Sequence, residues 1–275
     1  MSEIKCDTEY IGRQYIWLEE TDSTNSLLRR LINDGVTVEH EVEKGLLIEG
    51  TPAEGTIIVA DRQTAGRGRS GHSWESPKNT SVAMSVLLRP EVDDNSIPIV
   101  TLIAAIAVCD AVRKVCNLDT NIKWPNDVLI NNRKVCGILT ELDITSGTKS
   151  LILGVGINVN QDSFPEEINA IATSLSIESG EYVNRENLVE RFAESLEKYY
   201  ALFLKTGDMS LLKDEYEKHL ININRAVKVL DPGDSFEGTA RGIDEYGQLL
   251  VETGDGTIHR VYAGEVSVRG IYGYV

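Results

Sequence analysis

The stretch Gly66-Arg67-Gly68-Arg69-Ser70-Gly71-His72-Ser73-Trp74-Glu75-Ser76-Pro77 combines three glycines, two arginines and a tryptophan. Glycine lets the backbone take positive φ and approach a ligand closely, and arginine offers a planar, permanently charged fork for phosphate or carboxylate oxygens. Pro77 and the Asn, Thr and Ser residues after it do not favour a helix. The stretch therefore predicts a loop that binds an anion through arginines rather than through a helix N-terminus.

Two known phosphate-binding patterns match this loop in part. Gly66, Gly68 and Gly71 satisfy the spacing of the dinucleotide fingerprint, and a lysine in place of His72 would complete a P-loop. Both patterns need a strand before the glycines, which residues 56–60 predict, and a helix after them. Because no such helix is expected, neither pattern is complete.

A second cation comes from the segment Lys123-Trp124-Pro125-Asn126-Asp127. The proline disfavours the α region for the tryptophan before it, so the segment predicts a strand that ends at a fixed corner. Taken alone, the lysine is more often a solvated surface residue and the tryptophan more often a core residue.

A glycine pair lies in the last long apolar run, which predicts a buried strand over residues 150–159 after a hairpin at Asn131-Asn132. Gly154 and Gly156 remove side chains from one face of this strand. Alone, they are also compatible with a bulge or with close packing of a helix on the strand.

The order and spacing of these segments resemble the biotin protein ligase family. The resemblance covers nearly the whole chain from about Tyr15 and extends to Gly264-Glu265-Val266-Ser267-Val268-Arg269 near the C-terminus. The motifs that carry it are, in chain order, Asp22-Ser23-Thr24-Asn25, Gln63-Thr64-Ala65-Gly66-Arg67-Gly68-Arg69-Ser70-Gly71, Trp74-x-Ser76-Pro77, Lys123-Trp124-Pro125-Asn126-Asp127, Lys134-x-x-Gly137-Ile138-Leu139-x-Glu141 and Gly154-x-Gly156-x-Asn158-Val159-Asn160. An ordered set of this kind is more specific than any one motif.

The resemblance implies a two-step reaction of a biotin–[acetyl-CoA-carboxylase] ligase. Biotin attacks the α-phosphate of ATP, bound with Mg²⁺, to give biotinoyl-5′-AMP and pyrophosphate. A lysine of a biotin carboxyl carrier protein domain then takes the acyl group as an amide. Preorganised cations stabilise the charge that develops in the first step, and the sequence offers Arg67, Arg69 and Lys123.

Residue roles follow from the same resemblance. Lys123 and Arg69 are the catalytic candidates. Biotin contacts are expected from Ser23, Thr24, Asn25, Gln63, Gly66, Arg67, Gly68, Arg69, Lys123 and Gly137. Nucleotide contacts are expected from Arg69, His72, Trp74, Lys123, Asn126, Asn158 and Asn160. Many family members have arginine where this chain has His72. Ser23 or Asp22 also suits the N-cap of the helix expected from residue 23, so a capping role competes with the ligand role.

Composition limits the class of protein. The 275 residues carry 43 acidic against 27 basic side chains, a net charge of −16, which argues against general nucleic-acid binding. The four cysteines form no C-x-x-C pair, and the four histidines are too scattered for a local zinc signature. We therefore expect a reduced, cytoplasmic protein without a structural metal. The polar N-terminus does not resemble a signal peptide, and the apolar stretch 97–108 is expected to be a buried helix rather than a membrane span.

The fold expected is α+β, a mixed sheet with helices packed on one side, followed by a small SH3-like β-barrel. The domain boundaries are 1–222 for the catalytic domain and 223–275 for the barrel. Strands are predicted at 15–19, 45–49, 56–61, 81–88, 120–124, 127–130, 134–143 and 150–159, and helices at 23–34, 96–116, 185–205 and 208–219.

Three functions remain open from the residues. They are a biotin protein ligase, a lipoate ligase or octanoyl transferase of related architecture, and a non-enzymatic ligand-binding protein that keeps the fold. Only about twenty residues precede Ser23, so we expect the short family form, without the N-terminal DNA-binding domain of some relatives and without specific DNA binding. Homodimer formation stays open.

Overall fold

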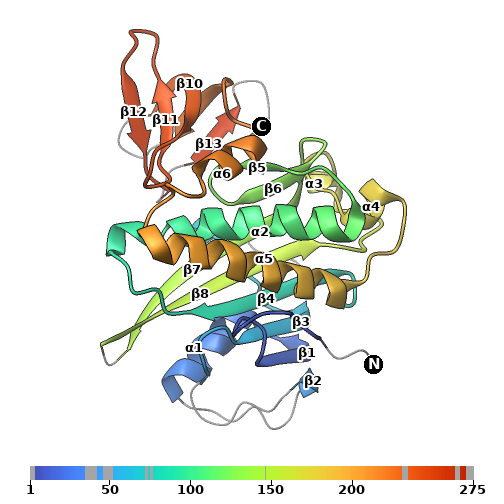
Figure 1. The fold of residues 1–275 in the computed structure, drawn as a ribbon. Coiled ribbons are helices and arrows are strands. Elements are labelled where there is room, and N and C mark those ends of the chain that lie inside the picture. Colours follow the sequence, from blue (N-terminus) through green and yellow to red (C-terminus); the bar gives the residue numbers. More distant parts are fainter. Residues whose placement is uncertain are drawn as a thin grey trace.

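An eight-stranded mixed sheet forms the centre of the molecule in the computed structural model (Figure 1). The structure describes residues 4–34, 42–45, 52–71, 74, 77–145, 147–230, 235–263 and 267–270. The strands are β1 (Tyr15–Thr21), β2 (Val42–Gly45), β3 (Ile57–Gln63), β4 (Ser81–Leu88), β5 (Asn121–Lys123), β6 (Asp127–Ile130), β7 (Arg133–Thr145) and β8 (Thr148–Asn158). Their order across the sheet is β2-β1-β3-β4-β8-β7-β6-β5, and of the pairs only β1 with β3 is parallel.

The two faces of the sheet carry separate hydrophobic clusters because successive strand residues point in opposite directions. In β1, Trp17 packs in the larger cluster with the long helices α2 (Ile99–Cys116) and α5 (Arg185–Thr206). Ile16 and Leu18 pack in the smaller cluster against Leu28 of α1 (Thr24–Asp34). The long helices cover one face, as expected, and α1 adds a helix on the opposite face.

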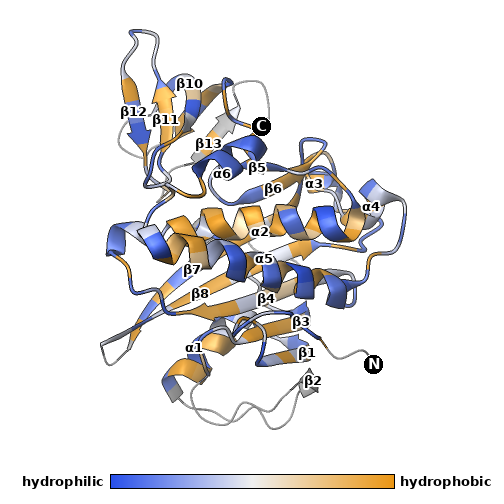
Figure 2. Cartoon of the chain, in the orientation of Figure 1, coloured by the Kyte–Doolittle hydropathy of each residue, from blue (hydrophilic) through white to orange (hydrophobic). Residues whose placement is uncertain are grey.

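Helix α2 is almost wholly buried, and Figure 2 shows it as mainly hydrophobic. In α5, hydrophobic and hydrophilic residues alternate (Figure 2). The stretch Asp94–Cys116 is long and apolar enough to cross a membrane by length and composition, but 78% of its most apolar window is buried inside the fold. It therefore serves as the core helix that the sequence predicted.

Helix α5 begins and ends where its sequence provides caps. The Asn184 side chain accepts a hydrogen bond from the backbone N–H of Asn187, and Gly207 ends the helix at φ 73°. Its predicted extent, 185–205, agrees with the observed Arg185–Thr206.

A five-stranded antiparallel sheet follows α6 (Lys213–His219) at the C-terminal end (Figure 1). Its strands are β9 (Ala226–Leu230), β10 (Phe236–Ile243), β11 (Leu249–Glu252), β12 (Ile258–Val261) and β13 (Ser267–Gly270), in the order β12-β11-β10-β9-β13. Within the described residues, β12 and β13 are the two ends of this sheet, so the expected closure into a barrel is not observed. The indole N–H of Trp124 donates to the carbonyl of Gly247 at 3.0 Å and joins this domain to the main sheet.

The predicted turn at Asn131-Asn132 is present between β6 and β7, with φ 50° and 63° at the two asparagines. Two short helices, α3 (Glu166–Asn169) and α4 (Leu175–Ser179), were not predicted. The Gly-Arg loop contains one 3-10 turn, Arg69–Gly71, where we expected no helix. The predicted strand at 45–49 corresponds to Val42–Gly45, and residues 46–50 lie outside the described part of the chain.

Candidate functional site

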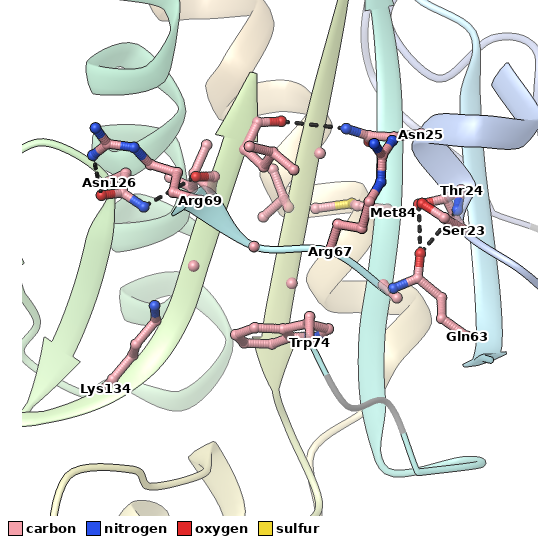
Figure 3. A pocket seen from close by; sticks show the side chains of 18 residues that line it. Ser23, Thr24, Asn25, Gln63, Arg67, Arg69, Trp74, Met84, Asn126 and Lys134 are labelled. Atoms are coloured by element: carbon pink, nitrogen blue, oxygen red, sulfur yellow. Dashed lines mark hydrogen bonds between the residues drawn. The ribbon is translucent and has the colours of Figure 1, made fainter. Parts of the chain in front are cut away.

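A pocket opens over the glycine-bearing strands β7 and β8, between the Gly-Arg loop and the start of α1. Figure 3 shows two groups of polar side chains facing each other across it, with Trp74 between them. The lining residues are Ser23, Thr24, Asn25, Gln63, Arg67, Gly68, Arg69, Trp74, Ala83, Met84, Asn126, Lys134, Gly137, Ile138, Leu139, Gly154, Val155 and Gly156.

One side of the pocket, which we call the floor, carries neutral polar groups on regular elements, Thr24 and Asn25 of α1 and Gln63 of β3, and Ser85 of β4 contacts Thr24 and Asn25 from behind. The backbone N–H of Thr24 donates to Gln63 Oε1 at 2.8 Å (Figure 3). The Ser85 hydroxyl lies 2.7 Å from Thr24 Oγ1 and 2.5 Å from Asn25 Oδ1. Thr24, Asn25 and Ser85 are all buried. The floor can therefore hydrogen-bond an uncharged polar ligand in a fixed orientation.

Two glycines of β8 leave the space in which Asn25 and Trp74 pack. A Cβ on Gly154 would lie 2.5 Å from Asn25 Oδ1, and a Cβ on Gly156 would lie 2.4 Å from the indole of Trp74. Any side chain at either position would displace the residue that packs on it. The glycine pair thus brings α1 and Trp74 onto β8, which agrees with the expectation of close helix packing at Gly154.

Three cations line the pocket: Arg67 lies beside the floor, where its Nη2 contacts Glu141 Oε2, and Arg69 and Lys134 lie on the opposite side, which we call the rim (Figure 3). Arg69 Nη1 donates to Asn126 Oδ1 at 2.9 Å, and Asn126 Nδ2 donates to the carbonyl of Ile138 at 3.1 Å (Figure 3). Burial lowers the pKa of Arg69, but a guanidinium stays charged at neutral pH. Arg69 is thus a fixed cation held on the strand side of the pocket.

Lys134 is the third cation and comes from the start of β7. Its Nζ lies 2.6 Å from Asp127 Oδ1 and 5.9 Å from the centre of the Trp74 ring. A flexible ammonium in this position can follow an anionic ligand while its carboxylate partner keeps it oriented. Among the described residues, no group of three or more His, Cys, Asp or Glu could hold a metal ion.

Comparison with known proteins agrees with this geometry. Residues 36–158 match the biotin/lipoate A/B protein ligase family, and residues 223–269 match the biotin protein ligase C-terminal domain. A bifunctional ligase/repressor of Bacillus spizizenii is 36% identical over 264 residues, covering 95% of this chain and 76% of that protein. The chain belongs to the biotin protein ligase family.

Two further members of this family, one compared by sequence and one by structure, are also similar to the chain. The biotin–[acetyl-CoA-carboxylase] ligase of Mycobacterium tuberculosis is 33% identical over 222 residues, which are 79% of this chain and 80% of that one. A solved structure of the Aquifex aeolicus biotin protein ligase in complex with biotin and ATP has a TM-score of 0.77 and 32% identity, covering 94% and 99% of the two chains.

Most residues expected to bind ligand in this ligase family line the pocket. They are Ser23, Thr24, Asn25, Gln63, Arg67, Gly68, Arg69, Trp74, Asn126 and Gly137. Gly66 lies beside the pocket, where its carbonyl accepts a hydrogen bond from the N–H of Trp74 at 2.9 Å. His72 is outside the described residues.

Besides Gly66, three expected residues are not among those lining the pocket. Lys123 is 7% exposed and pairs across the β5–β6 ladder with Asp127. Asn158 Nδ2 donates to the carbonyl of Thr173, and both ends of the Asn160 amide bond the backbone of Val183. Their amides thus tie the chain after β8 in place, and their expected ligand roles stay proposals.

The sequence assigned no role to Lys134, although the motif Lys134-x-x-Gly137 was part of the family resemblance. Lys123, Asp127 and Gly137 lie opposite one another across β5, β6 and β7, and the ammonium of Lys134, which pairs with Asp127, lines the pocket. Trp124 is 1% exposed and belongs to the core.

The start of α1 also has a role in capping, but not through Ser23. Asp22 Oδ1 accepts from the N–H of Ser23 at 2.8 Å, and Gln63 accepts from the N–H of Thr24. The first amides of the helix are therefore satisfied by Asp22 and by a residue of the neighbouring strand.

Proposed function

We propose that the protein is an ATP-dependent biotin protein ligase that modifies a lysine of a biotin carboxyl carrier domain. The observation that carries this proposal is one pocket that combines a neutral hydrogen-bonding floor with three cations, Arg67 beside the floor and Arg69 and Lys134 on the rim. A biotin molecule has the same two ends, an uncharged ureido ring and a carboxylate. The floor suits the ring, and the rim suits the carboxylate together with the phosphates of ATP.

In the first step a biotin carboxylate oxygen attacks the α-phosphorus, and the bond to the bridging oxygen of the leaving pyrophosphate breaks. Negative charge accumulates on the phosphoryl oxygens between two anionic reactants. Arg69 and Lys134 are placed to stabilise that charge without a side-chain nucleophile. We assign to Lys134 the catalytic role that the sequence suggested for Lys123, because Lys134 lines the pocket. Magnesium enters with ATP as part of the substrate.

In the second step the amine of the carrier lysine attacks the acyl carbon of biotinoyl-5′-AMP. AMP leaves with the electron pair of the broken C–O bond, the amine loses a proton, and an amide forms. Arg67 and Arg69 would hold the adenylate until the carrier arrives. Trp74, packed on Gly156, forms a wall of the pocket near the expected nucleotide.

Lipoate is the main competing substrate, because the matching family model also covers lipoate ligases. Lipoate has a carboxylate but no ureido ring, so the donors and acceptors of the floor would remain unpaired. Each such buried group costs about 1 to 3 kcal/mol. The floor therefore favours biotin.

Intact mass spectrometry of a biotin carboxyl carrier domain tests this proposal. The domain is incubated with the protein, ATP, Mg²⁺ and either biotin or lipoate. We expect one ATP-dependent addition with biotin and none with lipoate. Equal labelling by lipoate, or no labelling by biotin, would contradict the proposal.

A further inference from the structure

Residues 66–69 cross the pocket between its two sides, and we call this segment the strap. Gly68 of the strap lines the pocket, and the arginine side chains before and after it point in opposite directions (Figure 3). Arg69 extends to the rim, where its Nη1 donates to Asn126 Oδ1 at 2.9 Å. Arg67 extends to the side of the floor. The strap is therefore tied down on both sides of the pocket.

Glu141 of β7 is the main contact of the strap on the floor side. Its Oε2 lies 3.1 Å from Arg67 Nη2, and the Ser26 hydroxyl of α1 lies 3.3 Å from the same nitrogen. The Glu141 side chain is 19% exposed, whereas that of Arg67 is 45% exposed. Because one partner is largely shielded from solvent, salt screens this pair less than a pair on the open surface.

The carboxylate of Glu141 is also held in place by two residues of α1. Asn25 Nδ2 donates to its Oε2 at 2.7 Å, and Arg29 Nη2 lies 3.5 Å from its Oε1. A carboxylate held in this way loses little conformational freedom when the Arg67 guanidinium binds to it. Glu141 is thus a preorganised acceptor for the strap.

This contact places the charge of Arg67 beside the floor, away from Arg69 and Lys134 on the rim (Figure 3). An arginine can cover a ligand with its aliphatic stem while its charged head pairs elsewhere. Arg67 therefore suits a cover over the neutral end of a ligand, and the two rim cations suit the anionic end.

We propose that Glu141 is a positioning residue that anchors Arg67 and thereby keeps the strap over bound biotin. This inference rests on the proposed function, since the ligand retained is biotin and then its adenylate. Glu141 acts through Arg67 and does not need to touch the ligand. Because biotin leaves the floor when the strap lifts, a weaker anchor should mainly speed release.

Biotin release from the full-length protein tests the proposal. Tritium-labelled biotin is bound and then chased with an excess of unlabelled biotin. Glu141→Gln keeps the shape of the side chain but removes its charge, and release should become about 3- to 10-fold faster. Arg67→Ala removes the other partner and should speed release at least as much.

The double variant decides whether the two residues act through one contact. Release from Glu141→Gln/Arg67→Ala should stay within about twofold of Arg67→Ala alone. If the two effects multiply instead, Glu141 acts through Asn25 or through the fold, and the proposal is overturned. Unchanged release in Glu141→Gln would overturn it as well.

Asp143→Asn is the matched control. Asp143 lies two residues further along β7, and its carboxylate contacts Arg29 at 3.1 Å. The substitution removes the same charge from the same strand and should leave biotin release as in the wild type. An effect equal to that of Glu141→Gln would overturn the proposal.

Trypsin cleavage after Arg69 gives a second measurement, which needs no ligand. The rate is followed by mass spectrometry relative to cleavage after Lys149 of β8, and it should be faster in Glu141→Gln than in the wild type. Equal rates would overturn the inference. If Glu141→Gln does not fold, Glu141→Asp takes its place, because it keeps the charge but withdraws it from Arg67 by one methylene group. Failure of the wild-type protein to bind biotin would instead contradict the proposed function, and the cleavage rates would still test the anchor.

Discussion

The floor and the rim of the pocket differ in both chemistry and support. Thr24 and Asn25 of the floor, and Ser85 behind them, are at most 4% exposed and lie on a helix and a strand, whereas the cationic side chains of Arg67, beside the floor, and of Lys134, on the rim, are 45% and 28% exposed. Neutral groups that hydrogen-bond one another can be buried at little cost, but charged groups are costly to bury and remain near solvent. The difference suits a ligand with a neutral head and a reactive, anionic tail.

The largest expected effect is on the rim. Lys134→Ala should lower kcat for biotin-dependent ATP–pyrophosphate exchange on the order of 100- to 1000-fold, because it removes one preorganised donor from the transition state. The matched variant is Lys123→Met, which replaces a buried lysine that does not line the pocket and should cause a smaller loss. If a folded Lys123→Met protein loses as much exchange activity as Lys134→Ala, the assignment of the catalytic role to Lys134 in place of Lys123 is wrong.

Arg69 should act on retention of the adenylate as well as on its formation. Arg69→Gly removes the guanidinium that Asn126 holds at 2.9 Å, so some adenylate should form and escape. Released biotinoyl-5′-AMP would acylate lysines of a bystander protein, which a biotin blot detects. Arg62→Ala removes an arginine that pairs with Glu20 and should cause no such labelling. Modification confined to the carrier in Arg69→Gly would argue against this role.

On the floor, Thr24→Val should weaken biotin binding by about 5- to 100-fold, since it removes a hydroxyl from a buried network. The apparent KM for biotin should rise, while kcat at saturating biotin stays near that of the wild type. Steady-state exchange over a range of biotin concentrations measures both constants. A large loss of kcat with an unchanged KM would show that the floor takes part in the chemical step.

Added side-chain volume at the contact between Gly156 and Trp74 should lower the free energy of unfolding. Gly156→Ala places a Cβ 2.4 Å from the Trp74 ring, and overpacking of this kind typically costs about 1 to 3 kcal/mol. Denaturant unfolding measures the change. Gly254→Ala is the control because its Cβ would meet nothing within 4 Å. Equal stability of the two variants would contradict the packing of Trp74 on β8.

The smallest effect concerns pH and the start of α1. The Arg30 guanidinium beside Asp22 lowers the pKa of that carboxyl. Because the folded pKa is lower than the unfolded one, the stabilisation is present above about pH 4 and disappears as the pH falls through the folded value. An exposed pair of this kind contributes about 0 to 1 kcal/mol. Asp22→Asn should therefore differ from the wild type in unfolding free energy at pH 7, and the difference should shrink steadily as the pH falls below about 4. A difference that stays constant between pH 7 and pH 2 would contradict this assignment.

The sequence predicted those parts of the fold that depend on local signals. The apolar run of α2, the extent of α5 and the Asn131-Asn132 turn all lie where the residue pattern placed them. The short helices α3 and α4 were missed because four or five residues carry too little periodicity to stand out.

Predicting the site required contacts between distant segments. Ordered motifs were enough to collect most pocket residues, but they assigned no role to Lys134, whose place at the pocket is seen only from its contact with Asp127 of the neighbouring strand. The contact between Asn25 and Glu141 joins residues that are 116 positions apart. No local pattern marks such a pair, although both residues belong to the family motifs.

The most direct test of the division between floor and rim is biotin-dependent ATP–pyrophosphate exchange, measured for Thr24→Val and Lys134→Ala side by side as biotin is raised to saturation. The account predicts that Thr24→Val recovers nearly the wild-type rate at high biotin, because its defect is in binding. Lys134→Ala should stay far below that rate at every concentration, because its defect is in the transition state. Recovery of Lys134→Ala at high biotin, or a Thr24→Val rate that stays equally low, would contradict the account.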